Sequence, residues 1–371
     1  MSGLKITGLT KRFKDEVVLD DLILEIAEGE TLVLFGPSGA GKTVLLRCIA
    51  GAVDPEAGRI QIGGADVTDL PPEARGVGMA FQNFALFPHM SAFDNIASPL
   101  TAQRFSAEKI KEGVTDIARL LKIEHVLDHA PRALSNGQKQ RTALARALVA
   151  QPKLLLLDDP LRNVDAKLRF EMRLELPRLL AGQGTTVVYV TQDYKEAMAF
   201  ADKIAVLVDG RIVQIGKPED VYLRPADMRI AEQFGDPAIN FLDVTPERDA
   251  EGVHVRLSGK RVALADGYEA IVGRDCIIGI RPEAIRFADG ANAVEVTIEA
   301  ETPFNEKTVT LVTTMRKREI LISRPAGTPA PADGTATIDI DASTAVLFDR
   351  ATGARIAPDT DRTSKQEEEA A

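Results

Sequence analysis

The sequence predicts an α/β protein built on a parallel sheet, followed by a smaller β-rich domain. The apolar run 31–35, a glycine-rich loop and the helical pattern 44–50 follow one another directly, as in a strand–loop–helix unit. Two more apolar runs, 154–157 and 185–191, end in polar side chains, as buried parallel strands do where a site forms at the sheet edge. From 236 onward the sequence shows several short β-like runs instead.

The composition is that of a globular protein with room for two or three domains in 371 residues. No apolar run approaches the roughly 20 residues that span a bilayer, and the first residues do not begin a signal peptide. Cys48 and Cys276 fall in different predicted domains and form neither a disulfide framework nor a metal spacing, so we expect a reducing cytoplasm. A net charge of −10 disfavours nucleic acid as a general partner.

The first candidate site is the loop that follows the strand 31–35. Eight residues fit the pattern of Gly, four residues, then Gly-Lys-Ser/Thr: Gly36, Pro37, Ser38, Gly39, Ala40, Gly41, Lys42 and Thr43. The glycines let backbone N–H groups turn toward a phosphate chain, and the helix N-terminus adds partial positive charge. We expect Lys42 to reach the β- and γ-phosphates and Thr43 to bind Mg²⁺. A glycine-rich turn matching by chance is disfavoured by the strand before it and the helix after it.

Residues 4–35 alternate apolar and polar side chains, with turns at Lys14-Asp15 and Glu28-Gly29, which predicts a small antiparallel sheet leading into the loop. Within it, Phe13 either stacks on an adenine ring, if exposed, or belongs to the core. Gln82 ends a further predicted strand, where a polar side chain reaches Mg²⁺ or its water.

Residues 92–130 show apolar side chains at helical spacing. Ser135 then reads as an N-cap near Gly137, ahead of a helix over 142–148; this is either a second anion-binding end or only a cap.

The run 154–157 ends in Asp158 and Asp159. Asp158 is the Mg²⁺ partner expected of a phosphate-loop ATPase, although paired acids at a strand end also form turns.

Together these pieces resemble the ATP-binding cassette subunit of a membrane transporter along residues 1–350. The resemblance depends on five elements in order: Gly36–Thr43, the Gln82 loop, the Ser135–Gln138 signature, the strand Leu154–Asp158 and Asp165. The chain looks closest to the ATPase subunits of carbohydrate, glycerol-phosphate and polyol importers. The resemblance implies a P-loop nucleotide-binding domain with a helical subdomain, followed by an OB-like accessory domain, and ATP with Mg²⁺ as cofactors.

In such proteins, two nucleotide domains form a head-to-tail dimer that encloses two ATP molecules. Each ATP lies between one phosphate loop and the other subunit's signature, here Ser135, Gly137 and Gln138. The resemblance makes Phe13 the adenine-stacking aromatic and the segment after Gln82 the contact with the transmembrane permease. It also implies an ATPase peripheral to the cytoplasmic face of the membrane, linked indirectly to a periplasmic or extracellular solute-binding protein.

The resemblance divides the chain into a nucleotide-binding domain over 1–235 and an OB-like domain over 236–355. The helical subdomain covers about 83–150. The OB-like domain acts as a dimer brace or binds regulatory partners. The last residues, 356–371, contain three consecutive glutamates and no apolar periodicity, so we expect a disordered acidic tail.

Four positions depart from the family pattern. Asp159 stands where the family has the Glu that orients the attacking water, and a catalytic group misplaced by about 1 Å can cost on the order of a hundredfold in rate. Gln192 stands where the family has a His at the γ-phosphate, Asn136 replaces a Gly, and Arg162 replaces a Ser. The substitutions are either conservative drift or the mark of a specialised site.

We hypothesise that the chain binds MgATP but hydrolyses it slowly, and that it pairs with a related, complete ATPase subunit in an importer of a carbohydrate or polyol such as glycerol. The alternatives are a fully active homodimer, a regulatory subunit without catalysis, and a soluble cassette ATPase unconnected with transport. That last class usually joins two cassettes or carries a long coiled coil, and neither feature is present in the sequence. An exporter is disfavoured as well, because its membrane segments are often fused to the cassette and the OB-like accessory domain would be unexpected there.

Overall fold

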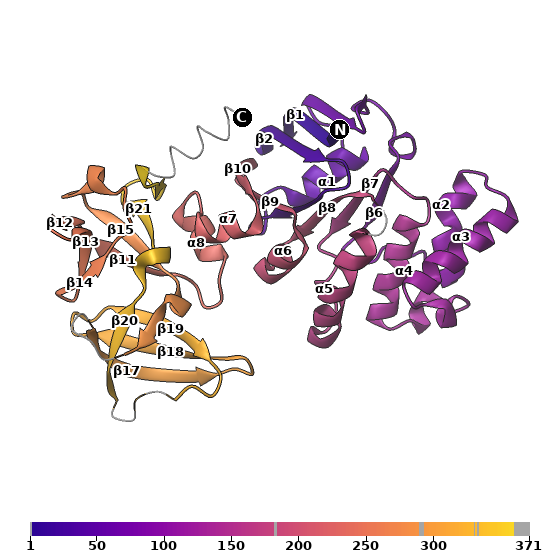
Figure 1. Cartoon of the computed structure of the whole chain (residues 1–371). Coiled ribbons are helices and arrows are strands. Elements are labelled where there is room, and N and C mark those ends of the chain that lie inside the picture. Colours follow the sequence, from indigo (N-terminus) through magenta and orange to yellow (C-terminus); the bar gives the residue numbers. More distant parts are fainter. Residues whose placement is uncertain (1, 182–183, 289–292, 330, 332–333, 360–371) are drawn as a thin grey trace. The chain divides into compact units, whose positions relative to one another are not determined.

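The computed structural model describes residues 2–181, 184–288, 293–329, 331 and 334–359 (Figure 1). The chain forms two compact units, 1–218 and 219–371, which are described separately. Among the described helices, none is long and apolar enough to cross a membrane. The predicted domain boundaries at 235 and 355 stay a prediction.

The first unit is built on a six-stranded sheet in the order β10-β9-β3-β8-β7-β6. All neighbouring strands are parallel except β9 and β10. The strands are β3 (Thr31–Phe35), β6 (Val77–Ala80), β7 (Leu154–Asp158), β8 (Thr186–Thr191), β9 (Lys203–Val208) and β10 (Arg211–Gly216). Strands β3, β7 and β8 were predicted from their continuous apolar runs, which are typical of strands buried on both faces.

A four-stranded antiparallel sheet, in the order β2-β1-β4-β5, lies over one face of this parallel sheet. Its strands are β1 (Ser2–Phe13), β2 (Glu16–Ala27), β4 (Ala57–Ile62) and β5 (Ala65–Asp66). The predicted turns at Lys14-Asp15 and Glu28-Gly29 are both present. Helix α1 (Lys42–Ala50) packs between the sheets, in one core with Leu32 and Leu34.

The opposite face of the parallel sheet is covered by α5 (Ala166–Ala181) and α6 (Tyr194–Phe200) (Figure 1). Tyr189 of β8 is fully buried there, edge-on to Phe200 with ring centroids 4.7 Å apart. Because side chains alternate along a strand, Val188 and Val190 face the other core while Tyr189 faces α6.

Three helices pack together beside the β6 edge of the sheet (Figure 1): α2 (Ala92–Ala102), α3 (Ala107–Leu120) and α4 (Asn136–Leu148). Short 3-10 turns η1 (Pro72–Ala74), η2 (Glu124–Val126) and η3 (Pro131–Ala133) connect this part of the chain. Our prediction of a helix from 142 was wrong at its start, because α4 begins six residues earlier at Asn136. Ser135 caps it and completes a capping box with Gln138.

The second unit begins with two short helices, α7 (Pro218–Leu223) and α8 (Met228–Gln233), and is otherwise β-rich, as predicted. Its three sheets have the orders β11-β15-β21-β22, β12-β13-β14 and β16-β20-β17-β18-β19, with every pair antiparallel. The strands are β11 (Asn240–Val244), β12 (Glu247–Asp249), β13 (Gly252–Leu257), β14 (Lys260–Ala263), β15 (Cys276–Ile280), β16 (Ile285–Phe287), β17 (Val294–Pro303), β18 (Lys307–Thr314), β19 (Glu319–Pro325), β20 (Thr335–Ile340), β21 (Val346–Asp349) and β22 (Arg355–Ile356). Turns η4 (Glu269–Ile271), η5 (Pro282–Ala284) and η6 (Ala342–Thr344) connect them.

Arg281 joins the helices of this unit to its sheets. Its buried guanidinium donates to the backbone carbonyls of Tyr222 at 2.7 Å, Ala231 at 3.0 Å and Phe234. It also lies 4.0 Å from the centroid of the Tyr222 ring. A single cation thus satisfies carbonyls from both α7 and α8 at the end of β15.

The predicted disordered tail, 356–371, was wrong at its start, because Ile356 of β22 pairs with Leu347 and the Asp359 N–H donates to the Gly267 carbonyl at 2.9 Å. From 360 onward that prediction lies outside the described residues.

Candidate functional site

The loop between β3 and α1 requires glycine at two points. A Cβ on Gly36 would lie 2.2 Å from the carbonyl oxygen of Leu207, and a Cβ on Gly41 would lie 2.8 Å from that of Val18. Gly41 is also the N-cap of α1 with a left-handed φ of 101°, and no side chain caps this helix. The first N–H groups of α1 are therefore directed at whatever lies in the loop, which is the arrangement that binds phosphate.

Lys42 lies within this loop and is 6% exposed. Its Nζ donates to the carbonyl oxygens of Gly36 at 2.7 Å and Pro37 at 2.6 Å. Burial lowers the pKa of the ammonium group, while the carboxylates of Asp159 and Asp158 act to raise it. The loop therefore holds a cation near the helix N-terminus, where an anionic phosphate chain would be neutralised.

The predicted metal ligands Thr43 and Asp158 are in contact. The Thr43 hydroxyl donates to Asp158 Oδ1 at 3.1 Å, and Asp158 is 6% exposed. Burial raises the pKa of this carboxyl, and the Thr43 hydrogen bond lowers it. Gln82 lines the same cavity, two residues beyond the end of β6 rather than at the strand end that we predicted.

The oxygen ligands available in this cavity fit Mg²⁺, which prefers hard oxygen ligands and keeps several waters. A hydroxyl, a carboxylate and an amide oxygen are available from Thr43, Asp158 and Gln82. Within the described residues, no group of three or more His, Cys, Asp and Glu side chains gathers as a separate metal site. Bound there, Mg²⁺ would neutralise charge on the β- and γ-phosphates.

Asp159 follows Asp158 at the end of β7 and is 8% exposed, with a φ of 46°. Its Oδ2 lies 3.4 Å from Nη1 of Arg162. Burial raises the pKa of the Asp159 carboxyl, and the charge of Arg162 lowers it. Our predicted site did not include Arg162, although its departure from the family pattern was visible in the sequence.

Gln192 comes directly after β8 and contacts the phosphate loop. The Ser38 hydroxyl oxygen lies 3.2 Å from Nε2 and 3.3 Å from Oε1 of Gln192. The amide therefore lies beside the loop, where it can donate to a terminal phosphate oxygen without carrying a positive charge.

One cavity of about 290 Å³ brings most of the predicted residues together. It is lined by Val18, Ser38, Gly39, Gly41, Lys42, Thr43, Val44, Gln82, Asp158, Asp159, Arg162, Val190 and Gln192. The predicted site residues that do not line it are Phe13, Gly36, Pro37, Ala40, Ser135, Gly137 and Gln138. Sequence reasoning missed Val18, which carries no polar group that would single it out.

Phe13 ends β1 with 47% of its surface exposed, so it is not a core residue. The Nζ of Lys11 lies 5.1 Å from its ring centroid. Ser135 and Gln138 lie at the N-terminus of α4, where Ser135 N donates to Gln138 Oε1 at 2.9 Å and Gln138 N to Ser135 Oγ at 3.3 Å. Ser135 and Gln138 therefore both have a local structural role in capping α4.

The segment after Gln82 borders a groove of about 1020 Å³, whose lining includes Phe81, Phe87 and Pro99. Arg146 of α4 holds the segment by donating to the carbonyls of Phe84 at 3.1 Å and Ala85 at 2.8 Å. Its guanidinium lies 5.5 Å from the Phe87 ring centroid, and burial lowers its pKa.

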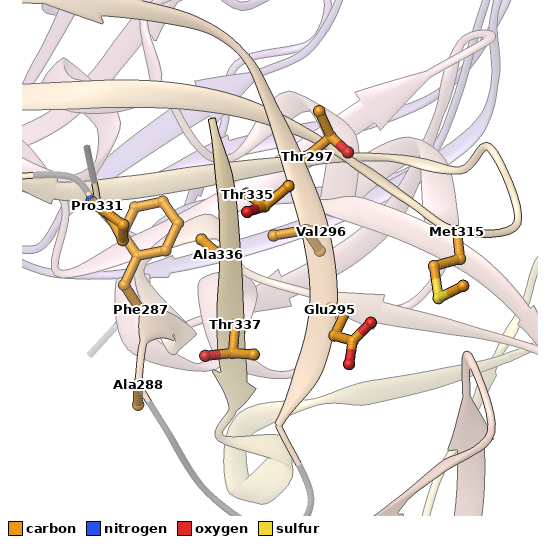
Figure 2. A pocket seen from close by; sticks show the side chains of 10 residues that line it. All are labelled: Phe287, Ala288, Glu295, Val296, Thr297, Met315, Pro331, Thr335, Ala336 and Thr337. Carbon is orange, nitrogen blue, oxygen red and sulfur yellow. The ribbon is translucent and has the colours of Figure 1, made fainter. Parts of the chain in front are cut away.

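A third hollow, of about 690 Å³, lies in the other unit against β17 and β20 (Figure 2). Glu295 of β17 pairs with Thr337 of β20, with Phe287 and Met315 on either side (Figure 2). No Lys, Arg or His is among the described residues that line it, so nothing there favours a nucleotide. The cavity around Lys42 is the candidate nucleotide site.

Three models of known families match the chain. The model described as ABC transporter matches residues 19–162, that of the MalK OB fold domain matches 235–285, and that of the TOBE domain matches 278–348. The first match contains the loop at Lys42 and the strand that ends at Asp158. The predicted P-loop fold and the OB-like domain are confirmed.

The chain is also similar to individual proteins over most of its length. It is 42% identical over 304 residues to the maltose/maltodextrin import ATP-binding protein MalK of Salmonella typhimurium, covering 81% of this chain and 82% of that protein. It is 41% identical over 319 residues to the trehalose/maltose import ATP-binding protein MalK of Thermococcus litoralis, covering 81% and 85%.

Two solved structures are similar to this chain, with 31% sequence identity. Each match covers 58% of this chain and 98% of the chain in the solved structure. One is the dimeric structure of MJ0796, a bacterial ABC transporter cassette, with a TM-score of 0.54. The other is a post-hydrolysis state of the same cassette bound to ADP and Pi, with a TM-score of 0.53. The chain belongs to the ABC transporter family, as an ATPase subunit with MalK-type OB and TOBE domains.

Proposed function

We propose that this chain binds MgATP in the cavity around Lys42 and energises the import of a sugar or polyol from the cytoplasmic face of the membrane. The observation that carries the proposal is the contact between Thr43 and Asp158, next to Lys42 in one cavity. A cation for the phosphates and an oxygen pair for the metal are the two requirements of a phosphate-loop ATPase.

The groove beside Phe81 and Phe87 is the proposed contact with the permease. Phe87 is 43% exposed, and Arg146 holds the neighbouring backbone. An exposed aromatic at the edge of a partly apolar groove suits an inserted helix from a membrane subunit. The Phe87→Ala change should release the chain from membranes that contain its permease, without altering MgATP affinity.

The dimer is proposed to place the N-terminus of α4 against the nucleotide of the other subunit. Ser135, Gly137 and Gln138 lie there, outside their own subunit's cavity. A helix N-terminus favours negative charge, which a γ-phosphate supplies. Phe13, exposed at the end of β1, is the proposed adenine platform.

Hydrolysis at the chain's own site is proposed to be slow. Lys42, Thr43 and Asp158 keep the binding chemistry, whereas Asp159 is one methylene shorter than Glu and Gln192 cannot become a cation. We further propose that the second subunit is a different ATPase with a complete site. MgATP affinity and turnover of the purified chain, beside the double change Asp159→Glu with Gln192→His, test this directly.

Tight binding with negligible turnover, raised at least about tenfold by the double change, would support slow hydrolysis. Family-like turnover by the unmodified chain would contradict it, and the homodimer would replace the unequal pair. Copurification of the chain from its native membranes supplies the second test, because a heterodimer yields two different ATPase subunits in equal amounts.

For the solute, we propose the sugar and polyol class, with glycerol as a specific candidate. The names of the relatives mention maltose, maltodextrin and trehalose. Uptake of labelled maltose, trehalose and glycerol should be compared in cells with and without the chain. Loss of glycerol uptake alone would support that candidate, and loss of disaccharide uptake alone would reject it. A Lys42→Ala copy serves as the matched control, since it should restore nothing.

A further inference from the structure

Asp159 has one side-chain partner among the residues that the structure describes. Its Oδ2 lies 3.4 Å from Nη1 of Arg162, three positions along the chain. The Asp159 side chain is 12% exposed and that of Arg162 is 50% exposed. The carboxylate is therefore largely shielded from bulk water, whereas the guanidinium is half exposed.

The backbone that carries Arg162 is itself held in place. Arg162 N donates to the carbonyl of Asp159 at 3.3 Å. From α5, the guanidinium of Arg169 donates to the carbonyls of Leu161 at 3.3 Å, Arg162 at 3.4 Å and Val164 at 3.2 Å. Because this turn is fixed on both sides, the Arg162 side chain starts from a defined point beside Asp159.

The other charges of the cavity have partners of their own. Lys42 donates to two loop carbonyls, and Asp158 accepts from Thr43. Asp159 and Arg162 form the remaining pair of opposite charges that line this cavity. A Ser at position 162 could not neutralise the carboxylate, whereas a guanidinium can.

We propose that Arg162 is a positioning residue that acts on hydrolysis through Asp159, by pairing with the carboxylate and keeping it from accepting the proton of an attacking water. This inference rests on the proposed MgATP site and gives a second cause of slow hydrolysis besides the short side chain. A carboxylate serves as a base only when an oxygen is free to contact the water. In the pair with Arg162, Oδ2 is engaged, and the nearby positive charge makes the whole carboxylate, Oδ1 included, a weaker proton acceptor.

The inference separates two roles that an arginine in this cavity could have. If Arg162 acts through Asp159, its removal frees the carboxylate and turnover rises. If it instead binds the terminal phosphate directly, its removal weakens ATP binding and turnover falls. The sign of the change in turnover therefore tells the two roles apart.

The experiment is a double-mutant cycle in the full-length chain with Arg162→Ser, Asp159→Asn and both changes together. We expect Arg162→Ser to raise kcat about three- to tenfold, with KM within about twofold, and to have no effect once Asp159→Asn is present. Arg162→Lys keeps the charge and should stay near the parent chain. Arg59→Ser is the matched control, because Arg59 is an exposed partner of Asp66 that does not line the cavity.

A second readout does not depend on turnover or metal. The affinity for a fluorescent ATP analogue is measured in EDTA for the same four chains. Asp159→Asn should tighten binding at least about threefold more when Arg162 is present than in the Arg162→Ser background, because the freed guanidinium can then attract phosphate. Thermal unfolding confirms that each variant is folded.

Additive effects in the binding cycle, or a fall in kcat on Arg162→Ser in both backgrounds, would overturn the inference. Fast turnover by the parent chain would overturn only the proposal of slow hydrolysis. The binding cycle would still measure the coupling between Asp159 and Arg162. Failure to bind the analogue in EDTA and with Mg²⁺ would reject both proposals.

Discussion

The Thr43 hydroxyl donates a hydrogen bond of 3.1 Å to the Asp158 carboxylate, although 115 residues separate the two along the chain. The contact exists because β3 and β7 both lie next to β8 in the parallel sheet, so that the start of α1 and the end of β7 meet at one edge. The contact therefore places the two proposed Mg²⁺ ligands, Thr43 and Asp158, side by side.

Removing the hydroxyl should uncouple metal from nucleotide. We expect Thr43→Val to raise the Kd for MgATP about tenfold and to leave the Kd for ATP in EDTA within about twofold, because the lost group binds the metal and not the phosphates. Isothermal titration measures both constants. Thr43→Ser keeps the hydroxyl and is the control; equal losses with and without Mg²⁺ in Thr43→Val would contradict the assignment.

Two glycines of the phosphate loop should differ sharply in their tolerance of alanine. A Cβ on Gly36 would lie 2.2 Å from a backbone oxygen, whereas a Cβ on Gly39 has nothing within 4 Å and meets only the strain of its φ of 83°. We expect Gly39→Ala to cost about 1–2 kcal/mol of the free energy of unfolding. Gly36→Ala should cost more than about 3 kcal/mol or prevent folding. Urea denaturation followed by circular dichroism tests the order, and equal costs would reject it.

Glu196 should make the stability of the chain depend on pH. It is 2% exposed and accepts hydrogen bonds of 2.8 Å from both Tyr189 and Thr191. Burial raises its pKa above the ordinary value, with the two hydrogen bonds opposing the shift. The folded state therefore binds this proton more tightly than the unfolded state, and the stabilisation is lost as pH rises through the folded pKa.

We expect Glu196→Gln to unfold at higher denaturant concentration than the parent at pH 8, and to lose that advantage toward pH 4. Glutamine accepts the same hydrogen bonds without a buried charge. Glu196→Ala is the contrast, since two buried hydroxyls lose their acceptor, at a cost of about 1–3 kcal/mol. Parallel pH profiles for the parent and Glu196→Gln would contradict the prediction.

Arg281 should dominate the stability of the second unit. We expect Arg281→Ala to cost about 3 kcal/mol in the free energy of unfolding, because several carbonyls of α7 and α8 lose a buried donor. Arg274→Ala is the matched control: this exposed partner of Asp349 should cost less than about 1 kcal/mol. Guanidinium denaturation of both variants makes the comparison, and similar costs would show that the carbonyls are otherwise satisfied.

Much of the parallel sheet was predictable from sequence because buried strands such as Leu154–Asp158 are continuous apolar runs that end in polar groups. The start of α4 was missed, because residues 136–141 are polar and give no apolar periodicity. The capping box formed by Ser135 and Gln138 was the available signal, and we used only its first half.

In the candidate site, too, some residues could be predicted from the sequence and others could not. Lys42 and Thr43 follow from a motif with fixed spacing and Asp158 from its place at a strand end, and the structure brings the three side chains into one cavity. Their roles in binding stay a prediction. The partner of Asp159 could not be predicted, since an ion pair at three positions' separation depends on the turn between them. That turn is set by Arg169, which lies on a helix beyond the motif.

Phe81 and Gln82 are neighbours in the chain, yet the first lines the large groove and the second lines the cavity around Lys42. The Phe81–Gln82 peptide therefore belongs to the wall of both hollows. Asn163 steadies this wall by donating from Nδ2 to the Gln82 carbonyl at 2.9 Å. Because one peptide bond joins the two residues, a shift of the Gln82 backbone would also move Phe81, so the two hollows are connected through the covalent chain itself.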